Sequence, residues 1–357
     1  MSEPQGKMTG KSAPLGATGL QVMRMGMGGI PIQRLDAQGS DRVLERAVEC
    51  GINFFDTARG YTDSESKLGR VLRRHRDRVV IASKSFSRGA EAILADIECS
   101  LKNLQTDRID IYQCHNVASD ADLEKILAPD GALAGLLMAQ GQGKIGHIGI
   151  SGHKPRILIK ALARFAFASI QVPCNFMETE AALELIPLAR QKRVGIIAMK
   201  PIGGGNIREV ALNFRFIFDQ GVDVAIPGMD AVRQVEENVA VLHDLSPLSA
   251  AETARLQAEK ERLGAVFCRR CEYCMPCPQG LPISFLHVLK NYYFLYDLKD
   301  WARERLAALA KTYKDCAACG QCVKKCPYHL DMPRIFRETL ERMRADEKAS
   351  PPGGRVP

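Results

Sequence analysis

Residues 79–84 read Val-Val-Ile-Ala-Ser-Lys, and residues 109–115 read Ile-Asp-Ile-Tyr-Gln-Cys-His. Each stretch is a short apolar run that ends in polar side chains, and an amphipathic pattern beginning near Gly89 lies between them. Short apolar runs that alternate with helical patterns are typical of strand–helix–strand units around a parallel sheet. The polar residues that end the two runs are therefore expected at one edge of such a sheet.

This pattern repeats over residues 20–245 and predicts eight strands, each followed by a helix. The expected strands are Val22–Gly28, Asn53–Asp56, Val79–Ser83, Ile109–His115, Ile145–Ser151, Ser169–Val172, Gly195–Met199 and Val222–Ile226. The helical patterns begin near Ser40, Ser64, Gly89, Ala121, Lys154, Thr179, Ile207 and Val232. Eight such units in about 225 residues match a closed (β/α)8 TIM barrel in number and size.

An open, doubly wound sheet is the alternative fold. Its dinucleotide-binding form needs G-x-G-x-x-G after the first strand, and Gly26-Met-Gly-Gly29 is too short for that fingerprint. We therefore prefer the closed α/β barrel. In such barrels the catalytic groups lie at the C-terminal ends of the strands.

The chain has 357 residues, of which 46% are hydrophobic and 25% charged, so it is long enough for a full-size core and a second domain. No run approaches the eighteen apolar residues of a membrane-spanning helix, and the first residues lack the apolar block of a signal peptide. We expect a cytoplasmic protein with no membrane segment. The net charge of +8 is uneven, because residues 264–357 carry 16 Lys and Arg against 10 Asp and Glu.

Eight of the twelve cysteines fall in two runs near the C-terminal end. In a reducing compartment, clustered thiols are expected to bind metal rather than to form disulfides. The later run is Cys316-x2-Cys319-x2-Cys322-x3-Cys326-Pro, and the earlier run is Cys268-x2-Cys271-x2-Cys274-x2-Cys277-Pro. The later run has the ferredoxin spacing for a 4Fe-4S cluster, in which the fourth cysteine usually reaches a second cluster.

The duplicated run predicts two 4Fe-4S clusters with crossed ligation. One cluster is expected on Cys268, Cys271, Cys274 and Cys326, and the other on Cys316, Cys319, Cys322 and Cys277. The shorter spacing before Cys277 makes it the least secure ligand. Zinc is the alternative metal, because tetrahedral sites with four cysteine ligands also use C-x2-C pairs. Three successive x2 steps followed by Cys-Pro favour the iron–sulfur cluster.

These patterns predict four segments. Residues 1–19 form an N-terminal extension, and residues 20–263 form the barrel with a connecting helix that begins at the capping box Ser249-Ala-Ala-Glu252. Residues 264–346 form a small α-helical, ferredoxin-like iron–sulfur domain. Residues 347–357, which include Pro-Pro-Gly-Gly, form a disordered tail.

Three expected strand ends carry side chains of complementary chemistry: Asp56, Tyr61 five residues later, Lys84 and His115. Hydride addition to a carbonyl needs a proton donor for the developing alkoxide, and a phenol with an ordinary pKa of about 10 needs help near neutral pH. An ammonium group at Lys84 would lower the pKa of Tyr61, and Asp56 would keep Lys84 charged. His115 would orient or polarise the carbonyl.

Several segments resemble the aldo/keto reductase family. They are Gly51-Ile-Asn-Phe-Phe-Asp-Thr-Ala-Arg-Gly-Tyr61, Ile81-Ala-Ser-Lys84, Ile111-Tyr-Gln-Cys-His115, Gly149-Ile-Ser-Gly-His153, residues 171–175, Met199-Lys-Pro-Ile-Gly-Gly-Gly205 and residues 226–238. Residues 20–335 as a whole resemble the subgroup with a C-terminal 4Fe-4S domain. The resemblance implies a barrel with Asp56, Tyr61, Lys84 and His115 as the catalytic tetrad. It also implies hydride transfer between NADH or NADPH and a small carbonyl or alcohol substrate.

The resemblance further implies a nicotinamide site at the barrel mouth. Ser151 and Gln171 would bind the carboxamide, and Glu237 with Asn238 would face the adenine. The other candidate cofactor residues are Gly28, Gly29, Met199, Lys200, Gly203, Gly204, Gly205 and Gly228. Lys200 would either meet a cofactor phosphate or remain a solvated strand-end lysine.

Other positions depart from the family pattern. Met199 stands where many relatives stack an aromatic ring on the nicotinamide, and Gly152 replaces the asparagine beside the carboxamide serine. Asp230 lies where NADP-using relatives bind the 2′-phosphate, and its carboxylate would repel that group. Arg233 would restore binding of the 2′-phosphate only if its side chain turned inward. The sequence therefore argues against a strict requirement for NADPH.

The clusters leave the leading hypothesis incomplete, because a nicotinamide delivers two electrons together whereas each cluster accepts one. The clusters are expected to serve a ferredoxin- or flavoprotein-type electron partner, to sense redox state, or to stabilise their domain. The alternative function is an iron–sulfur electron-transfer or redox-sensing protein whose barrel is not a nicotinamide-dependent reductase. Nucleic-acid binding is not expected, because the cluster charges offset much of the basic excess and no binding motif accompanies it.

Overall fold

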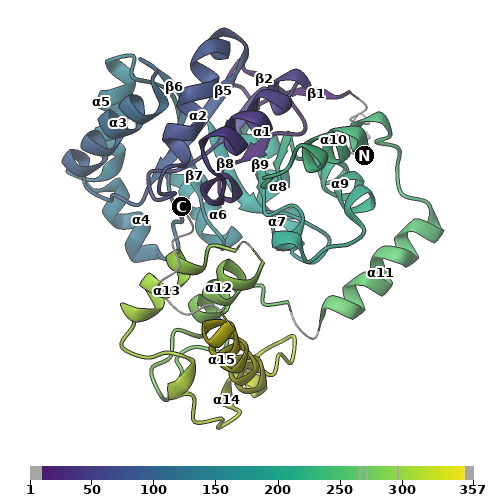
Figure 1. Cartoon of the computed structure of the whole chain (residues 1–357). Coiled ribbons are helices and arrows are strands. Elements are labelled where there is room, and N and C mark those ends of the chain that lie inside the picture. Colours follow the sequence, from purple (N-terminus) through teal and green to yellow (C-terminus); the bar gives the residue numbers. More distant parts are fainter. Residues whose placement is uncertain (1–9, 265–266, 271, 296, 350–357) are drawn as a thin grey trace. The chain divides into compact units, whose positions relative to one another are not determined.

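The computed structural model describes residues 10–264, 267–270, 272–295 and 297–349 (Figure 1). The chain divides into two compact units, residues 1–256 and 257–357. The division falls within the connecting helix α11 (Ala250–Gly264). The predicted capping box begins this helix, since the backbone N–H of Ser249 donates to the Glu252 carboxylate over 2.8 Å and Glu252 N–H donates to the Ser249 hydroxyl over 3.3 Å.

The first unit is a nearly closed barrel of eight parallel strands. The strands are β3 (Met27–Gly28), β4 (Phe54–Asp56), β5 (Val80–Ser85), β6 (Ile109–Cys114), β7 (Ile145–Ser151), β8 (Ser169–Pro173), β9 (Gly195–Met199) and β10 (Val224–Ile226), and each pairs with its sequence neighbour. Parallel bridges from Met25 to Ala225 and from Gly28 to Gly228 join the two edges of the sheet. The predicted (β/α)8 barrel is confirmed.

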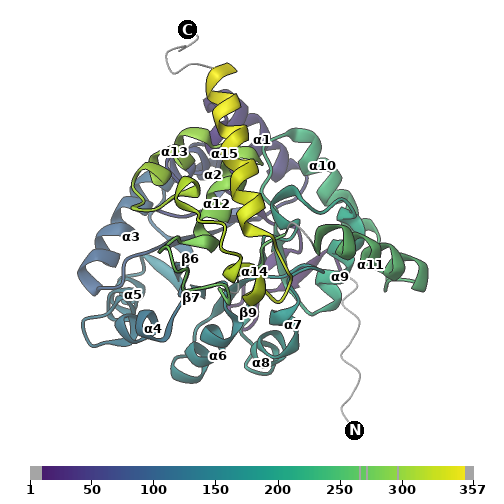
Figure 2. The same ribbon diagram turned by 90° about the horizontal axis from the view of Figure 1, so that it is seen from below.

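Helices surround the strands of this unit (Figure 2). They are α1 (Ala37–Glu49), α2 (Ser64–Leu72), α3 (Ala90–Leu104), α4 (Asp120–Leu127), α5 (Ala132–Gly141), α6 (Pro155–Arg164), α7 (Glu180–Leu183), α8 (Leu185–Gln191), α9 (Val210–Asp219) and α10 (Val232–Ala240). Side-chain caps begin two of them: Asp36 accepts from Gly39 N–H over 2.6 Å, and Ser119 accepts from Asp122 N–H over 3.1 Å. Two helices follow β6 and two follow β8, where the sequence pattern predicted one in each place.

The first expected strand, Val22–Gly28, is divided in the structure. Its start forms β2 (Gln21–Met23), which pairs antiparallel with β1 (Ser12–Pro14), and its end forms the barrel strand β3, Met27–Gly28, with Met25 bridged to Ala225. The hairpin places Leu15 and Val22, both fully buried, in the core inside the barrel. Burial of these two apolar side chains favours the hairpin over a longer barrel strand.

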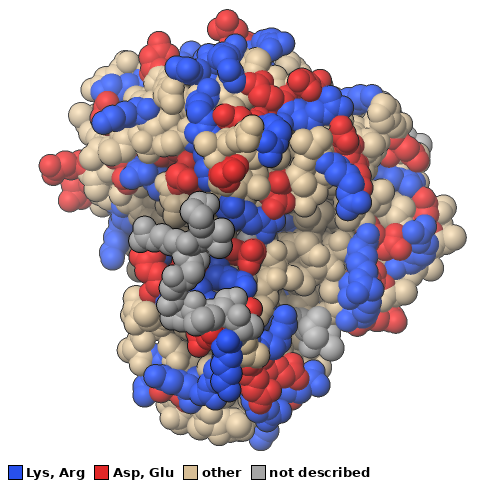
Figure 3. All heavy atoms as spheres, in the orientation of Figure 1, with Lys and Arg blue, Asp and Glu red and all other residues tan. Residues whose placement is uncertain are grey.

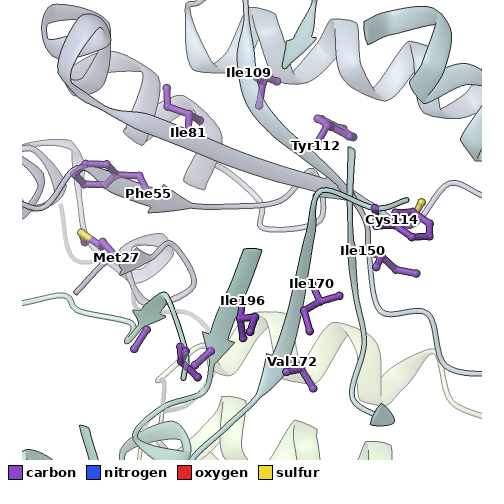
Figure 4. Close-up of a cluster of buried hydrophobic side chains, with 14 of the residues drawn as sticks. Met27, Phe55, Ile81, Ile109, Tyr112, Cys114, Ile150, Ile170, Val172 and Ile196 are labelled. Carbon is purple, nitrogen blue, oxygen red and sulfur yellow. The ribbon is translucent and has the colours of Figure 1, made fainter. Parts of the chain in front are cut away.

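Alternation along the strands produces two apolar cores. The inner core contains Leu15, Val22, Phe54, Val80, Ala82, Ile111, Ile197, Val224 and Ile226. The outer core lies between strands and helices, where Phe55, Ile81, Tyr112 and Ile150 extend from their strands (Figure 4). Because successive strand residues face opposite sides, Gln113 between Tyr112 and Cys114 faces the interior of the barrel.

The second unit is small and helical. It contains α12 (Ile283–Phe294), α13 (Lys299–Ala307), the single-turn 3-10 helix η5 (Tyr313–Asp315), α14 (Gln321–Lys325) and α15 (Met332–Ala349). Its own core includes Leu286, Tyr293, Tyr313 and Phe336. Helix α15 continues to Ala349, three residues into the segment predicted as a disordered tail.

The surface carries charges of both signs. On the face drawn in Figure 3, Lys and Arg side chains are interspersed with Asp and Glu side chains. Within the described part of the chain, no helix combines the length and apolar character needed to cross a membrane.

The hairpin under the barrel yields a stability prediction. Substituting Leu15→Ala should lower the free energy of unfolding of the barrel unit by about 2–5 kcal/mol, because it removes a fully buried side chain from the inner core. Urea denaturation followed by circular dichroism measures the loss. The matched control is Leu183→Ala, whose side chain is 76% exposed. Equal effects of the two substitutions would show that the hairpin is not part of the core.

Candidate active site and cluster sites

Adjacent parallel strands bring the predicted catalytic residues together. Asp56 is the last residue of β4, Lys84 lies near the end of β5, and His115 directly follows β6. Tyr61 lies in the loop between β4 and α2. Because β4, β5 and β6 are neighbours in the sheet, all four residues lie at its C-terminal edge.

Asp56 and Lys84 form a buried ion pair. Lys84 Nζ lies 2.6 Å from Asp56 Oδ2 and also donates to the Thr57 carbonyl oxygen over 2.7 Å. Asp56 is 3% exposed and Lys84 1%. Burial raises the pKa of Asp56 and lowers the pKa of Lys84, while the charge of each partner opposes the shift of the other. Each charge is therefore retained only because the other is in contact with it.

Two aromatic rings lie beside this pair. Lys84 Nζ lies 5.1 Å from the centroid of the Tyr61 ring, a cation–π distance. The Tyr61 and His115 rings meet edge to face, with centroids 5.7 Å apart and an interplanar angle of 83°. Burial lowers the pKa of His115 well below its ordinary range, and the charges of Lys84 and Arg88 lower it further. His115 is therefore a neutral imidazole at neutral pH.

Sequence reasoning missed two residues at this site. Phe86 stacks on the His115 ring, with centroids 3.9 Å apart and an interplanar angle of 19°, yet it remains 54% exposed. Gln113 is fully buried, and its amide nitrogen lies 3.4 Å from Asp56 Oδ1. Alternation along β6 places Gln113 toward the barrel interior, but its partners come from other strands and cannot be read from the sequence.

The two predicted carboxamide ligands already have partners inside the barrel. Ser151 Oγ donates to the Cys114 carbonyl over 3.3 Å and accepts from Asn116 N–H over 2.9 Å. Gln171 Oε1 accepts from Gln113 Nε2 over 2.7 Å, and Gln171 Nε2 lies 3.4 Å from Asp56 Oδ2. Gln171 therefore lies in the same buried group of polar side chains as Asp56, Lys84 and Gln113.

The other predicted cofactor residues gather where β3, β9 and β10 end. Met199 ends β9, and Lys200 follows it with its carbonyl oxygen accepting from Asn175 over 3.1 Å. Gly203, Gly204 and Gly205 form the short 3-10 helix η3. Gly28 ends β3 and Gly29 follows it, and Gly28 is bridged to Gly228 after β10. Loops after the last two strands of such barrels frequently form phosphate sites.

The segment after β10 shows how Asp230 and Arg233 differ. Asp230 forms an ion pair with Arg34 of the loop after β3. Arg233 is 84% exposed and lies 3.4 Å from Glu237, so it does not turn inward. Asn238 is buried, whereas the Glu237 side chain is mostly exposed. The positive charge nearest Asp230 therefore comes from Arg34, which the sequence did not indicate.

The described cysteines of the second unit line two cavities. One cavity is lined by Cys277, Cys316, Cys319 and Cys322, and the other by Cys268, Cys274 and Cys326. The predicted ligand Cys271 lies outside the described residues. Each cavity is thus lined by cysteines from both runs. It contains those of the first three cysteines of one run that the structure describes, together with the last cysteine of the other run. A cavity lined by several thiols has the donor set that a 4Fe-4S cluster requires.

Zinc and a cubane cluster place different demands on four cysteine ligands. A zinc ion draws its four ligands to about 2.0–2.3 Å, whereas a cubane cluster spreads its cysteines over four iron atoms. Among the described residues, no group of three or more His, Cys, Asp or Glu side chains is placed to hold a single metal ion.

Comparison with known proteins agrees with this geometry. Residues 22–213 match the aldo/keto reductase family, which is more than half of the chain. The chain belongs to the aldo/keto reductase family. Residues 267–331 match a 4Fe-4S dicluster domain. The protein is therefore an oxidoreductase of the aldo/keto reductase type with an iron–sulfur domain.

Individual relatives cover the barrel of this aldo/keto reductase. L-galactose dehydrogenase from Arabidopsis thaliana is 26% identical over 297 residues, which is 69% of this chain and 92% of that protein. A Pseudomonas aeruginosa structure described as an aldo-keto reductase is 30% identical, with a TM-score of 0.59 over 65% of this chain and 93% of that one. An aldo/keto reductase from Klebsiella pneumoniae, solved with NADP and acetate, has the same fold at 24% identity, with a TM-score of 0.60 over 70% of this chain and 95% of that one.

Iron content tests the ligand assignment. The variant Cys277→Ser should lose about half of its iron and acid-labile sulfide, because it removes one thiol from one of the two predicted four-iron clusters. Anaerobic purification followed by iron and sulfide determination measures the loss. Cys99→Ser, which removes an exposed thiol of α3, should keep the full content. Full iron content in both variants would remove Cys277 from the ligand set.

Proposed function

We propose that the barrel transfers a hydride between a nicotinamide cofactor and a small carbonyl or alcohol substrate, with Tyr61 as the general acid. The observation that carries the proposal is the buried Asp56–Lys84 pair, whose ammonium lies 5.1 Å from the centroid of the Tyr61 ring. Burying two charges costs several kcal/mol for each ion before their attraction is counted. A charge held at this depth beside a phenol is the arrangement that lowers the phenol pKa for proton donation.

The side chains act on the proton rather than on the hydride. The nicotinamide, when bound, supplies the hydride. Tyr61 donates its hydroxyl proton to the carbonyl oxygen as that oxygen gains negative charge, and Lys84 stabilises the resulting phenolate. Asp56 keeps Lys84 charged and fixed in position. His115, which is neutral, orients the carbonyl through a hydrogen bond and does not itself supply the proton.

Ser151 and Gln171 are proposed to hold the carboxamide of the nicotinamide. Each has a spare hydrogen-bonding capacity, because an amide or hydroxyl oxygen has two lone pairs. The loops after β9 and β10, with Gly203, Gly204 and Gly205, are proposed to hold the phosphates. Glu237 and Asn238 are proposed to lie near the adenine.

The second unit is proposed to bind two 4Fe-4S clusters in the crossed arrangement. The two cavities support this proposal, since each is lined by cysteines from both runs. The clusters would exchange single electrons with a ferredoxin- or flavoprotein-type partner, because the hydride of the barrel reaction carries two electrons at once. Titrating cluster-loaded protein with NADH and with NADPH, followed by fluorescence, visible absorbance and EPR, tests cofactor binding and cluster reduction separately.

Removing the phenol should abolish turnover and spare cofactor binding. Tyr61→Phe is expected to lower kcat for NADH-dependent reduction of 4-nitrobenzaldehyde by about 10²–10⁴-fold, because the proton donor is lost. The dissociation constant of NADH should stay within about twofold, since the ring remains. The control is Tyr273→Phe, a 65% exposed tyrosine of the second unit. Undiminished kcat in Tyr61→Phe would contradict the assignment.

The Arg34–Asp230 pair yields a prediction about cofactor choice. In Asp230→Asn, the repulsion of a 2′-phosphate disappears and Arg34 is released to pair with it. The ratio of the NADPH to the NADH dissociation constant should then fall about tenfold. The control is Glu236→Gln, which removes a carboxylate on α10 that pairs with Arg46 over 2.9 Å. An unchanged ratio in Asp230→Asn would place the 2′ position elsewhere.

A further inference from the structure

A layer of polar side chains crosses the interior of the barrel and includes the buried Asp56–Lys84 pair. Its members are Asp56 of β4, Lys84 of β5, Gln113 of β6 and Gln171 of β8. Gln113 is the register partner of Lys84, and it is the member that connects the two sides of the layer. Gln113 Nε2 lies 2.7 Å from Gln171 Oε1 and 3.4 Å from Asp56 Oδ1.

A glycine on the intervening strand leaves room for this connection. Gly149 of β7 is the register partner of Gln113, and β7 separates β6 from β8. A Cβ atom at position 149 would lie 2.9 Å from Gln113 Cγ, closer than such contacts occur. The amide of Gln113 therefore passes over β7 at a position without a side chain.

The negative charge of Asp56 determines the orientation of the side-chain amides of Gln113 and Gln171. A carboxylate only accepts hydrogen bonds, so each glutamine presents its N–H2 group to it. Gln113 then has one N–H directed at Asp56 and the other at Gln171 Oε1. Gln171 Nε2 in turn lies 3.4 Å from Asp56 Oδ2, which fixes its orientation from the other end. The Gln113 oxygen contacts no donor among the described residues, so Gln113 acts in this layer as a double donor.

We propose that Gln113 is a positioning residue that holds the Gln171 amide in place for the nicotinamide carboxamide and joins it to the Asp56–Lys84 pair. This inference rests on the proposed function of the barrel. One lone pair of Gln171 Oε1 is engaged by Gln113, and the second remains for an N–H of the carboxamide. Without Gln113, the Gln171 side chain would have one partner less and would rotate among several conformers before each binding event.

A double-mutant cycle tests this role. Gln113→Met keeps the length and volume of the side chain and removes both donors, so the fold should be retained. It should weaken NADH binding by about 5–20-fold, as expected for one lost positioning hydrogen bond beside a charged group. In Gln171→Met, adding Gln113→Met should change the dissociation constant by less than about twofold, because Gln113 acts through Gln171. Fluorescence titration gives the four constants, and thermal unfolding checks the fold of each variant.

A matched control separates positioning from packing. Ile111→Val alters the same strand and the same inner face two residues away, with no polar group involved. It should leave the NADH dissociation constant unchanged. A constant in Gln113→Met equal to that of the unsubstituted protein, or effects of Gln113→Met and Gln171→Met that simply add, would overturn the inference while leaving the hydride-transfer proposal in place.

A second measurement does not depend on cofactor binding. In the cofactor-free protein, the side-chain amide of Gln171 should give a sharp, slowly exchanging NMR signal, and Gln113→Met should broaden it and speed its exchange. An unaltered signal in Gln113→Met overturns the inference by itself. If the unsubstituted protein binds neither NADH nor NADPH, the proposed function fails, and the carboxamide part of the inference fails with it.

Discussion

The candidate active site depends on the contact between Lys84 Nζ and Asp56 Oδ2. This contact is 2.6 Å long, and both side chains are almost fully buried. Neither charge is stable alone at that depth, because burial favours the neutral form of each. Hydrogen-bond donors offset part of the cost of burying the Asp56 carboxylate. The side-chain amides of Gln113 and Gln171 approach it, as does the Lys84 ammonium group. The pair can then present a positive charge to the Tyr61 ring.

Much of the fold was predictable because strand spacing and apolar runs are local properties of the sequence. The eight barrel strands were found, whereas the hairpin of β1 and β2 was not, because its pairing depends on Leu15 and Val22 reaching a core built by distant strands. The doubled helices after β6 and β8 were also missed. Between α4 and α5 the chain reads Ala128-Pro-Asp-Gly131, a strong stop and turn signal that the prediction overlooked. The break between α7 and α8 falls at Glu184, which is not a stop residue.

The candidate site was predictable where chemistry and strand ends coincide, as for Asp56, Lys84 and His115. It was not predictable where a side chain acts through a neighbour from another strand. Gln113 belongs to an apolar run, and only the register of β6 with β5 and β7 shows that it bridges two sides of the barrel. The Arg34–Asp230 pair is similar, because Arg34 and Asp230 are 196 positions apart and meet only when the first and last strands close the sheet.

The barrel interior contains the polar layer that includes Asp56 and Lys84 and, below it, the apolar inner core. This order leaves access to the pair from the mouth of the barrel alone. Below the polar layer, the inner core of Phe54, Val80, Ala82 and Ile111 excludes water from beneath Asp56 and Lys84. Above it, Tyr61 is half-buried and Phe86 is 54% exposed. In the proposed reaction, a substrate carbonyl would approach the Tyr61 hydroxyl from this exposed side, and the proton that Tyr61 gives up would be replaced from the same side. The buried Asp56–Lys84 pair would stay in place beneath the phenol throughout, which is the arrangement that a proton donor used once in each turnover requires.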